Sequence, residues 1–162
     1  MKIGLVGVRD PGLARRFAAA GVHVFACGAE ELAADARIVL LPNAVAVSQA
    51  LVPPRVVWLD LADGFATELA IQDVWPECAP GDVVVDAGAG TPADARRRAA
   101  SLASARLHFV DCHVGDDGAL TFGGSDDAMR IVVPYAGLVG QWQHGGPSGS
   151  GYALHARKAT PA

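Results

Sequence analysis

The first twelve residues, MKIGLVGVRDPG (Met1–Gly12), decide how the rest of the chain is interpreted. Lys2–Val6 is a short apolar run and a helix-like segment follows it, which is typical of the first strand and helix of a βαβ unit. Gly7 and Gly12 occupy the first and third glycine positions of a G-x-G-x-x-G turn, whose middle glycine lets the backbone approach a pyrophosphate. Arg9 stands at the middle position, so a side chain occupies the space of the phosphates.

Length, composition and charge limit the classes of protein to which the chain can belong. The 162 residues suit one domain, and 51% of them are hydrophobic, which is enough for a core. The net charge is -4, and the one basic cluster, Arg96–Arg98, is predicted to be the solvent-exposed face of a helix, so no nucleic-acid partner is expected. The three cysteines lack C-x-x-C spacing, so neither a disulfide framework nor a metal site is predicted. There is no signal-peptide pattern and no apolar run of about 18 residues, so a cytoplasmic protein without membrane contact is expected.

Strand-like and helix-like segments alternate along the whole chain, which predicts an α/β fold with a Rossmann-like, doubly wound, mainly parallel sheet. Strands are expected at Lys2–Val6, Val22–Cys27, Arg37–Leu41, Arg55–Leu61, Asp82–Ala87, Leu107–Cys112, Ala119–Gly123 and Val139–His144. Helical segments are expected at Pro11–Ala20, Ala29–Ala34, Asn43–Leu51, Ala66–Trp75, Pro92–Ala103, Asp126–Tyr135 and Ser148–Lys158. Asn43, Thr91 and Ser125 are expected to begin three of the helices. Asp60 and Asp86 fall near the carboxyl ends of strands, where ligands bind in this class of fold.

Five stretches carry a more specific likeness: KIGLVG (2–7), PPRVVWL (53–59), PGDVVVDAG (80–88), LHFVDC (107–112) and GGPSGSG (145–151). In this order the chain resembles the nucleotide-binding domain of the 6-phosphogluconate dehydrogenase and β-hydroxyacid dehydrogenase superfamily, in particular the bacterial decarboxylating 6-phosphogluconate dehydrogenases. The resemblance covers almost the whole chain and implies an NADP or NAD cofactor, followed by a large helical domain that closes the substrate site. The chain ends where that domain would begin, so we expect a single stand-alone domain, residues 1–162, in which 148–162 start the interdomain helix.

The resemblance also assigns site residues. It implies that the cofactor would contact Gly7, Val8, Arg9, Gly12, Leu61, Ala62 and Gly88. Gly28 stands where the family carries an acid for the NAD ribose or Asn-Arg-type residues for the NADP phosphate, and only Glu30 lies nearby. His155 stands at the position of the family's catalytic lysine, and Ala159 at that of its asparagine.

The former substrate cleft would be lined by His113, His155 and Tyr152, which are the candidate catalytic residues. With Cys112, Asp116 and Asp117 nearby, these side chains suit a new acid/base reaction, since imidazole titrates near neutral pH. The alternatives are a metal site, for which the spacing gives no sign, or partly exposed residues of a relaxed site. Arg9 likewise has two interpretations: it binds a ligand phosphate, or it folds over an empty site and pairs with an acid such as Asp10.

Three functions remain compatible with these residues, so whether the chain is an enzyme stays open. The first is a degenerate family member that has lost standard hydride transfer and binds a small ligand or partner in the old cleft, with or without repurposed acid/base chemistry. The second is an active NAD(P)-dependent oxidoreductase that uses His155 in place of the lysine. The third is a structural or regulatory interaction module. In each case a homodimer or partner protein is expected to cover the C-terminal helix, whose apolar residues lack their usual cover.

Overall fold

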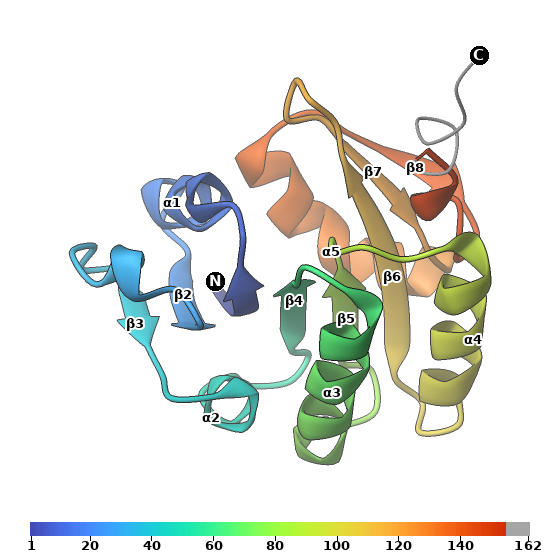
Figure 1. Ribbon diagram of the computed structural model, residues 1–162, viewed down its shortest axis with the longest axis horizontal. Coiled ribbons are helices and arrows are strands. Elements are labelled where there is room, and N and C mark those ends of the chain that lie inside the picture. The colour runs from blue at the N-terminus through green and yellow to red at the C-terminus, as the bar shows by residue number, and fades with distance from the viewer. Residues whose placement is uncertain (155–162) are drawn as a thin grey trace.

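The computed structural model describes residues 1–154, which form one sheet with helices on both faces (Figure 1). The strands are β1 (Lys2–Val8), β2 (His23–Cys27), β3 (Ile38–Leu40), β4 (Val56–Asp60), β5 (Val83–Asp86), β6 (His108–Val114), β7 (Leu120–Gly123) and β8 (Trp142–Gly146). The helices are α1 (Pro11–Ala19), α2 (Ala44–Gln49), α3 (Gly64–Val74), α4 (Pro92–Ala103) and α5 (Asp126–Val139), with short 3-10 turns η1 (Glu30–Leu32) and η2 (Trp75–Glu77).

The strand order is β3-β2-β1-β4-β5-β6-β7-β8. Every neighbouring pair is parallel except β6 and β7, which run antiparallel. The order steps from β1 outward to β2 and β3 on one side, and to β4 and β5 on the other, which is the doubly wound arrangement. The predicted fold class is therefore confirmed. The switch between the two directions lies between β1 and β4, and it places their carboxyl ends side by side.

Two apolar layers hold the helices to the sheet. Trp58 of β4 lies in the layer that includes α1 and α5. Its ring meets Phe17 of α1 and Phe122 of β7 edge to face, each at 5.9 Å between centroids. Val57 and Leu59 of the same strand face the other layer, formed with α2, α3 and α4. All five residues of β4 are buried because both of its faces are covered, as is expected of a central parallel strand.

Side chains at the helix starts fix where the helices begin. Asn43, Asp63, Thr91 and Ser125 each accept a backbone N–H from the first turn of their helix, and Thr91 forms a reciprocal capping box with Asp94. The helix starts expected at Asn43, Thr91 and Ser125 are confirmed. The helix expected from Ala66 begins two residues earlier, at Gly64, because the Asp63 carboxylate caps it.

The last predicted strand is wrong in its bounds. Residues up to Val139 belong to α5, and the strand β8 begins only at Trp142. Buried residues at helical spacing, Val132, Ala136 and Val139, carry the helix past Pro134, which lies on the exposed face. Among residues 1–154, no helix combines the length and apolar character that a membrane crossing requires. The helix predicted from Ser148 starts by residue 152, and its remainder falls in 155–162, outside the described residues.

Candidate functional site

The turn after β1 is built around a glycine that no other residue can replace without strain. Gly7 has φ +64°, and a Cβ placed on it would lie 2.1 Å from Cδ2 of Leu61. Leu61 follows β4, so the first turn and the loop after β4 are in direct contact. Gly88, after β5, is equally confined, since its Cβ would lie 2.6 Å from the Leu61 carbonyl oxygen. Gly7, Leu61 and Gly88, which are three of the positions predicted to contact a cofactor, thus pack against one another. Ala62, which is another of those positions, is exposed beside them.

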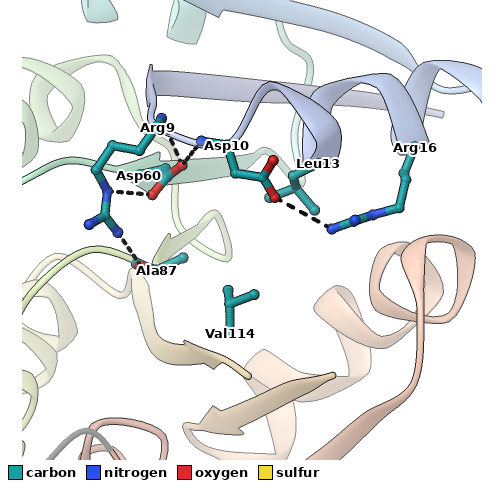
Figure 2. A pocket seen from close by; sticks show the side chains of 7 residues that line it. All are labelled: Arg9, Asp10, Leu13, Arg16, Asp60, Ala87 and Val114. Carbon is teal, nitrogen blue, oxygen red and sulfur yellow. Dashed lines mark hydrogen bonds and ion pairs between the residues drawn. The ribbon is translucent and has the colours of Figure 1, made fainter. Parts of the chain in front are cut away.

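Arg9 is bound to the end of β4. Its Nε donates to Asp60 Oδ1 at 2.9 Å, and its backbone N–H donates to Asp60 Oδ2, also at 2.9 Å. The backbone N–H of Asp10 donates to the same Oδ2 at 3.0 Å. The Arg9 guanidinium then reaches across to the carbonyl oxygen of Ala87 at 3.1 Å (Figure 2). The acid that pairs with Arg9 is therefore Asp60, while the Asp10 carboxylate accepts the N–H of Gly12.

A pocket of about 310 Å³ opens beside this ion pair, at the carboxyl ends of the central strands. Figure 2 shows Arg9 and Arg16 on its opposite sides, with Val114 between them. The lining carries two cations, two acids and three apolar residues: Arg9, Arg16, Asp10, Asp60, Leu13, Ala87 and Val114. Ligands of doubly wound α/β proteins bind at this edge, beside the switch in strand order.

Of the candidate catalytic residues, His113 and Tyr152 do not line this pocket. His113 lies within β6, which continues two residues past the predicted end, and its side chain is buried opposite Thr121. Tyr152 is fully buried, and the carboxylate of Asp86 lies near its hydroxyl. Burial, more than the neighbouring carboxylate, raises the pKa of Tyr152 above its ordinary value. His155 lies outside the described residues, so the catalytic roles assigned to these three residues stay predictions.

Asp111 is a functional position that the sequence interpretation passed over. Its fully buried carboxylate accepts the backbone N–H groups of Gly149 at 2.6 Å and Tyr152 at 2.8 Å. Asp111 thereby fixes the glycine segment of residues 145–151 to the middle of β6. Burial raises the pKa of Asp111 although these N–H groups oppose the change. The available signal was an acid near the predicted end of the strand Leu107–Cys112, although the structure places Asp111 in the middle of β6, in register with Asp86.

The prediction that all of Arg96–Arg98 lie on the solvent-exposed face of a helix is wrong for Arg98. The helix α4 places Arg96 and Arg97 in contact with solvent, but only 3% of the Arg98 side chain is exposed. Its Nη1 donates to Asp86 Oδ2 at 2.9 Å and its Nε to Glu68 Oε1 at 2.8 Å. Three consecutive residues of a helix point in directions about 100° apart, so they cannot share one face.

The acid at the centre of this network, Asp86, also accepts the N–H of Gly88 at 2.8 Å. Burial raises the pKa of Asp86, and the effects of Tyr152, Gly88 and Arg98 oppose that change without cancelling it. Within residues 1–154 no group of three or more histidine, cysteine, aspartate or glutamate side chains is placed to hold a metal ion. The polar network is therefore one of hydrogen bonds and ion pairs that join β5 to α3 and α4.

Comparison with known proteins agrees with this architecture. The model of one family, described as the NAD binding domain of 6-phosphogluconate dehydrogenase, matches residues 2–133. The NADP(+)-dependent, decarboxylating 6-phosphogluconate dehydrogenase of Bacillus subtilis (strain 168) is 30% identical over 118 residues, which are 64% of this chain and 25% of that protein. YqeC of the same organism, provisionally named a 6-phosphogluconate dehydrogenase, is 27% identical over 171 residues, covering 95% of this chain and 57% of its own. The chain thus spans a quarter to about half the length of these relatives.

Solved structures share the fold. An imine reductase from Myxococcus stipitatus in complex with NADP+ superposes with a TM-score of 0.86 at 17% identity, covering 97% of this chain and 59% of that one. The 3-hydroxyisobutyrate dehydrogenase of Mycobacterium tuberculosis gives a TM-score of 0.81 at 22% identity, covering 97% and 58%. The matched residues include β1 to β7 and the first turn. The chain belongs to the family of NAD-binding domains of 6-phosphogluconate dehydrogenase.

Proposed function

We propose that this domain has lost dinucleotide-dependent hydride transfer and binds a small molecule in the pocket beside Arg9. The observation that carries the proposal is the bonding of the first turn, where the family's cofactor would place its pyrophosphate. Pyrophosphate binds such a turn through backbone N–H groups at the start of the helix. In this chain those N–H groups already have partners.

From Arg9 to Leu13, every backbone N–H is bonded within the chain. Those of Arg9 and Asp10 donate to Asp60, and those of Gly12 and Leu13 donate to the side chain and carbonyl of Asp10. Pro11 has no N–H to offer. A pyrophosphate would therefore have to displace a carboxylate that is already in hydrogen-bonded contact, so this arrangement of the turn does not fit a dinucleotide.

Two further features oppose a dinucleotide. The Arg9 side chain crosses from the first turn to Ala87, through the region between the loops after β1 and β5 (Figure 2). At the end of β2, Gly28 with φ +71° offers no side chain to a ribose, and Glu30 is exposed at the start of η1. The groups that would hold both the phosphates and the adenosine ribose are thus committed elsewhere or missing.

A small molecule suits the remaining space better. At about 310 Å³ the pocket is at the lower end of the range for small-molecule sites. Its apolar residues, Leu13, Ala87 and Val114, offer contact area. The Arg16 side chain is 41% exposed, and its guanidinium forms a long ion pair of 3.8 Å with the exposed Asp10, which a ligand anion can replace. This combination favours a small ligand that carries a carboxylate or phosphate beside an apolar part.

The test is a titration of the purified chain with NADP+ and NAD+, by calorimetry and by tryptophan fluorescence. We expect no saturable signal up to about 5 mM, which corresponds to a binding free energy weaker than about 3 kcal/mol. A dissociation constant in the micromolar range for either cofactor would contradict the proposal.

A second measurement tests the small-molecule part of the proposal. A panel of small carboxylates and phosphate monoesters is screened by thermal shift against the unmodified chain, Arg16→Ala and Arg15→Ala. Arg15 is exposed on the same helix and does not line the pocket, so it is the matched control. We expect at least one compound to stabilise the unmodified chain and Arg15→Ala but not Arg16→Ala; a panel without such a compound contradicts this part.

A further inference from the structure

We infer that Asp60 is a built-in substitute for a ligand phosphate, and that Asp60 is the residue that decides which anions the first turn accepts. This inference rests on the proposed loss of dinucleotide binding. It gives the cause of that loss as the occupation of the first turn by the Asp60 carboxylate. Its basis is the convergence of three donors on one carboxylate: two consecutive backbone N–H groups and the Nε of Arg9.

The donors that surround Asp60 are those that an external anion would use. The N–H groups of Arg9 and Asp10 lie at the start of α1, a nine-residue helix whose N-terminus favours negative charge. A guanidinium beside them adds a charge-assisted bond, which is the usual partner of phosphate and carboxylate alike. Only 12% of the Asp60 side chain is exposed, so the carboxylate fills this place rather than approaching it from solvent.

The sheet delivers Asp60 to the turn. Asp60 is the last residue of β4, and its Cα pairs with that of Val8 immediately before Arg9. The register between the two strands shifts after Val6, so β1 advances one extra residue toward the end of β4. Because both groups belong to neighbouring strands, the carboxylate is present at a high effective concentration that a free anion must exceed.

Arg9 and Asp60 have unequal roles in this arrangement. Removal of Arg9 alone leaves the Asp60 carboxylate on the two N–H groups, now without its counter-charge, so the turn should still reject anions. Removal of Asp60 alone releases both N–H groups and the guanidinium, so the turn should gain an anion site. A double change that also removes the Arg9 side chain opens the path to Ala87 and should admit a whole dinucleotide.

The test compares Asp60→Ala, Asp60→Asn, Arg9→Gly and the double variant Arg9→Gly/Asp60→Ala. The probes are inorganic pyrophosphate and NADP+, titrated by calorimetry. We expect pyrophosphate to bind Asp60→Ala at least about tenfold more tightly than the unmodified chain, the gain from about one charge-assisted hydrogen bond. Arg9→Gly alone should show no gain for either probe, and NADP+ should gain most in the double variant.

Asp73→Asn, an exposed acid on α3 without an ion pair among the residues described, controls for the loss of one negative charge. Asp60→Asn keeps the side-chain shape and serves if Asp60→Ala does not fold; it should show a smaller gain for pyrophosphate. Circular dichroism and melting curves establish that each variant is folded. Folded Asp60 variants with no more affinity for pyrophosphate than Asp73→Asn would overturn the inference but leave the proposed function standing. Micromolar binding of NADP+ by the unmodified chain would instead contradict the proposed function.

Discussion

Replacement of Arg98 by methionine should destabilise the fold far more than the same change at Arg97, one residue earlier. Arg98 is 3% exposed and pairs with Asp86, whose side chain is fully buried. Arg97 pairs with Glu68, and these side chains are 56% and 33% exposed. Methionine keeps most of the apolar stem in both cases, so the difference isolates the charge in the interior.

The exposed fractions of these two ion pairs set the expected loss of unfolding free energy for each variant. Removing one partner of a buried ion pair leaves an uncompensated charge and costs about 3–5 kcal/mol. An exposed pair contributes less than about 1 kcal/mol, because water screens it and two long side chains lose conformational freedom. For a domain of this size, each kcal/mol corresponds to about 2–4 °C in Tm. We therefore expect Arg98→Met to lower Tm by about 10 °C and Arg97→Met by about 4 °C at most.

The stability lost in Arg98→Met should also depend on pH. Burial raises the pKa of Asp86 in the native fold, and removal of Arg98 raises it further. A carboxyl whose pKa is higher in the folded state favours folding as the pH falls and it gains a proton. The deficit of Arg98→Met should therefore shrink between about pH 7.5 and about pH 5, because a protonated Asp86 needs no counter-charge.

Urea unfolding of the unmodified chain and both variants at these two pH values provides the measurement. The variant Arg98→Met/Asp86→Asn supplies an independent check: the amide oxygen still accepts the N–H of Gly88 while the charge is gone, so more than half of the lost stability should return. Equal losses for Arg97→Met and Arg98→Met, or a deficit that grows toward low pH, would refute the assignment of Asp86 and Arg98 as a buried pair.

Two further changes test the positions that hold the site together. Asp111→Ala should cost about 2–5 kcal/mol in urea unfolding, since it leaves the buried N–H groups of Gly149 and Tyr152 without an acceptor; a loss below about 1 kcal/mol would contradict this role. Gly7→Ala should lower Tm by several degrees, because alanine at φ +64° is strained and its Cβ would meet Leu61; an unchanged melting curve would contradict the packing of these two loops.

The fold was predictable because its signals are local. The central strands β4 and β5 are apolar up to their last residue. The residues that begin three of the helices are Asn43, Thr91 and Ser125, whose side chains cap the first turn. The wrong bounds of the last strand arose at Pro134, which usually ends a helix. Here the proline lies on the exposed face, and burial of Val139 extends the helix, which only tertiary packing decides.

The site was predictable in position but not in its bonding. The first turn, the loop after β4 and the loop after β5 do meet, as strand order requires. Which acid pairs with Arg9 depends on the register between β1 and β4, a contact over 51 positions that no local pattern encodes. The same holds for Arg98, because a run of three arginines does not reveal which one faces Asp86 in the interior.

The neighbouring strands β4 and β5 end in an acid, β6 carries one in its middle, and each acid is used inside the chain. Asp60 of β4 accepts from the first turn, Asp86 of β5 accepts from Arg98, and Asp111 of β6 accepts from the glycine segment before Tyr152. Asp86 pairs directly with Asp111 of β6 and with Leu59 of β4, so Asp60 lies one residue further along and faces the opposite side of the sheet. All three acids lie toward the edge formed by the carboxyl ends of β4 and β5. This is the edge at which doubly wound proteins present polar groups to ligands. Because internal donors hold all three acids, the chemistry left for a ligand is that of the pocket around Arg9 and Arg16.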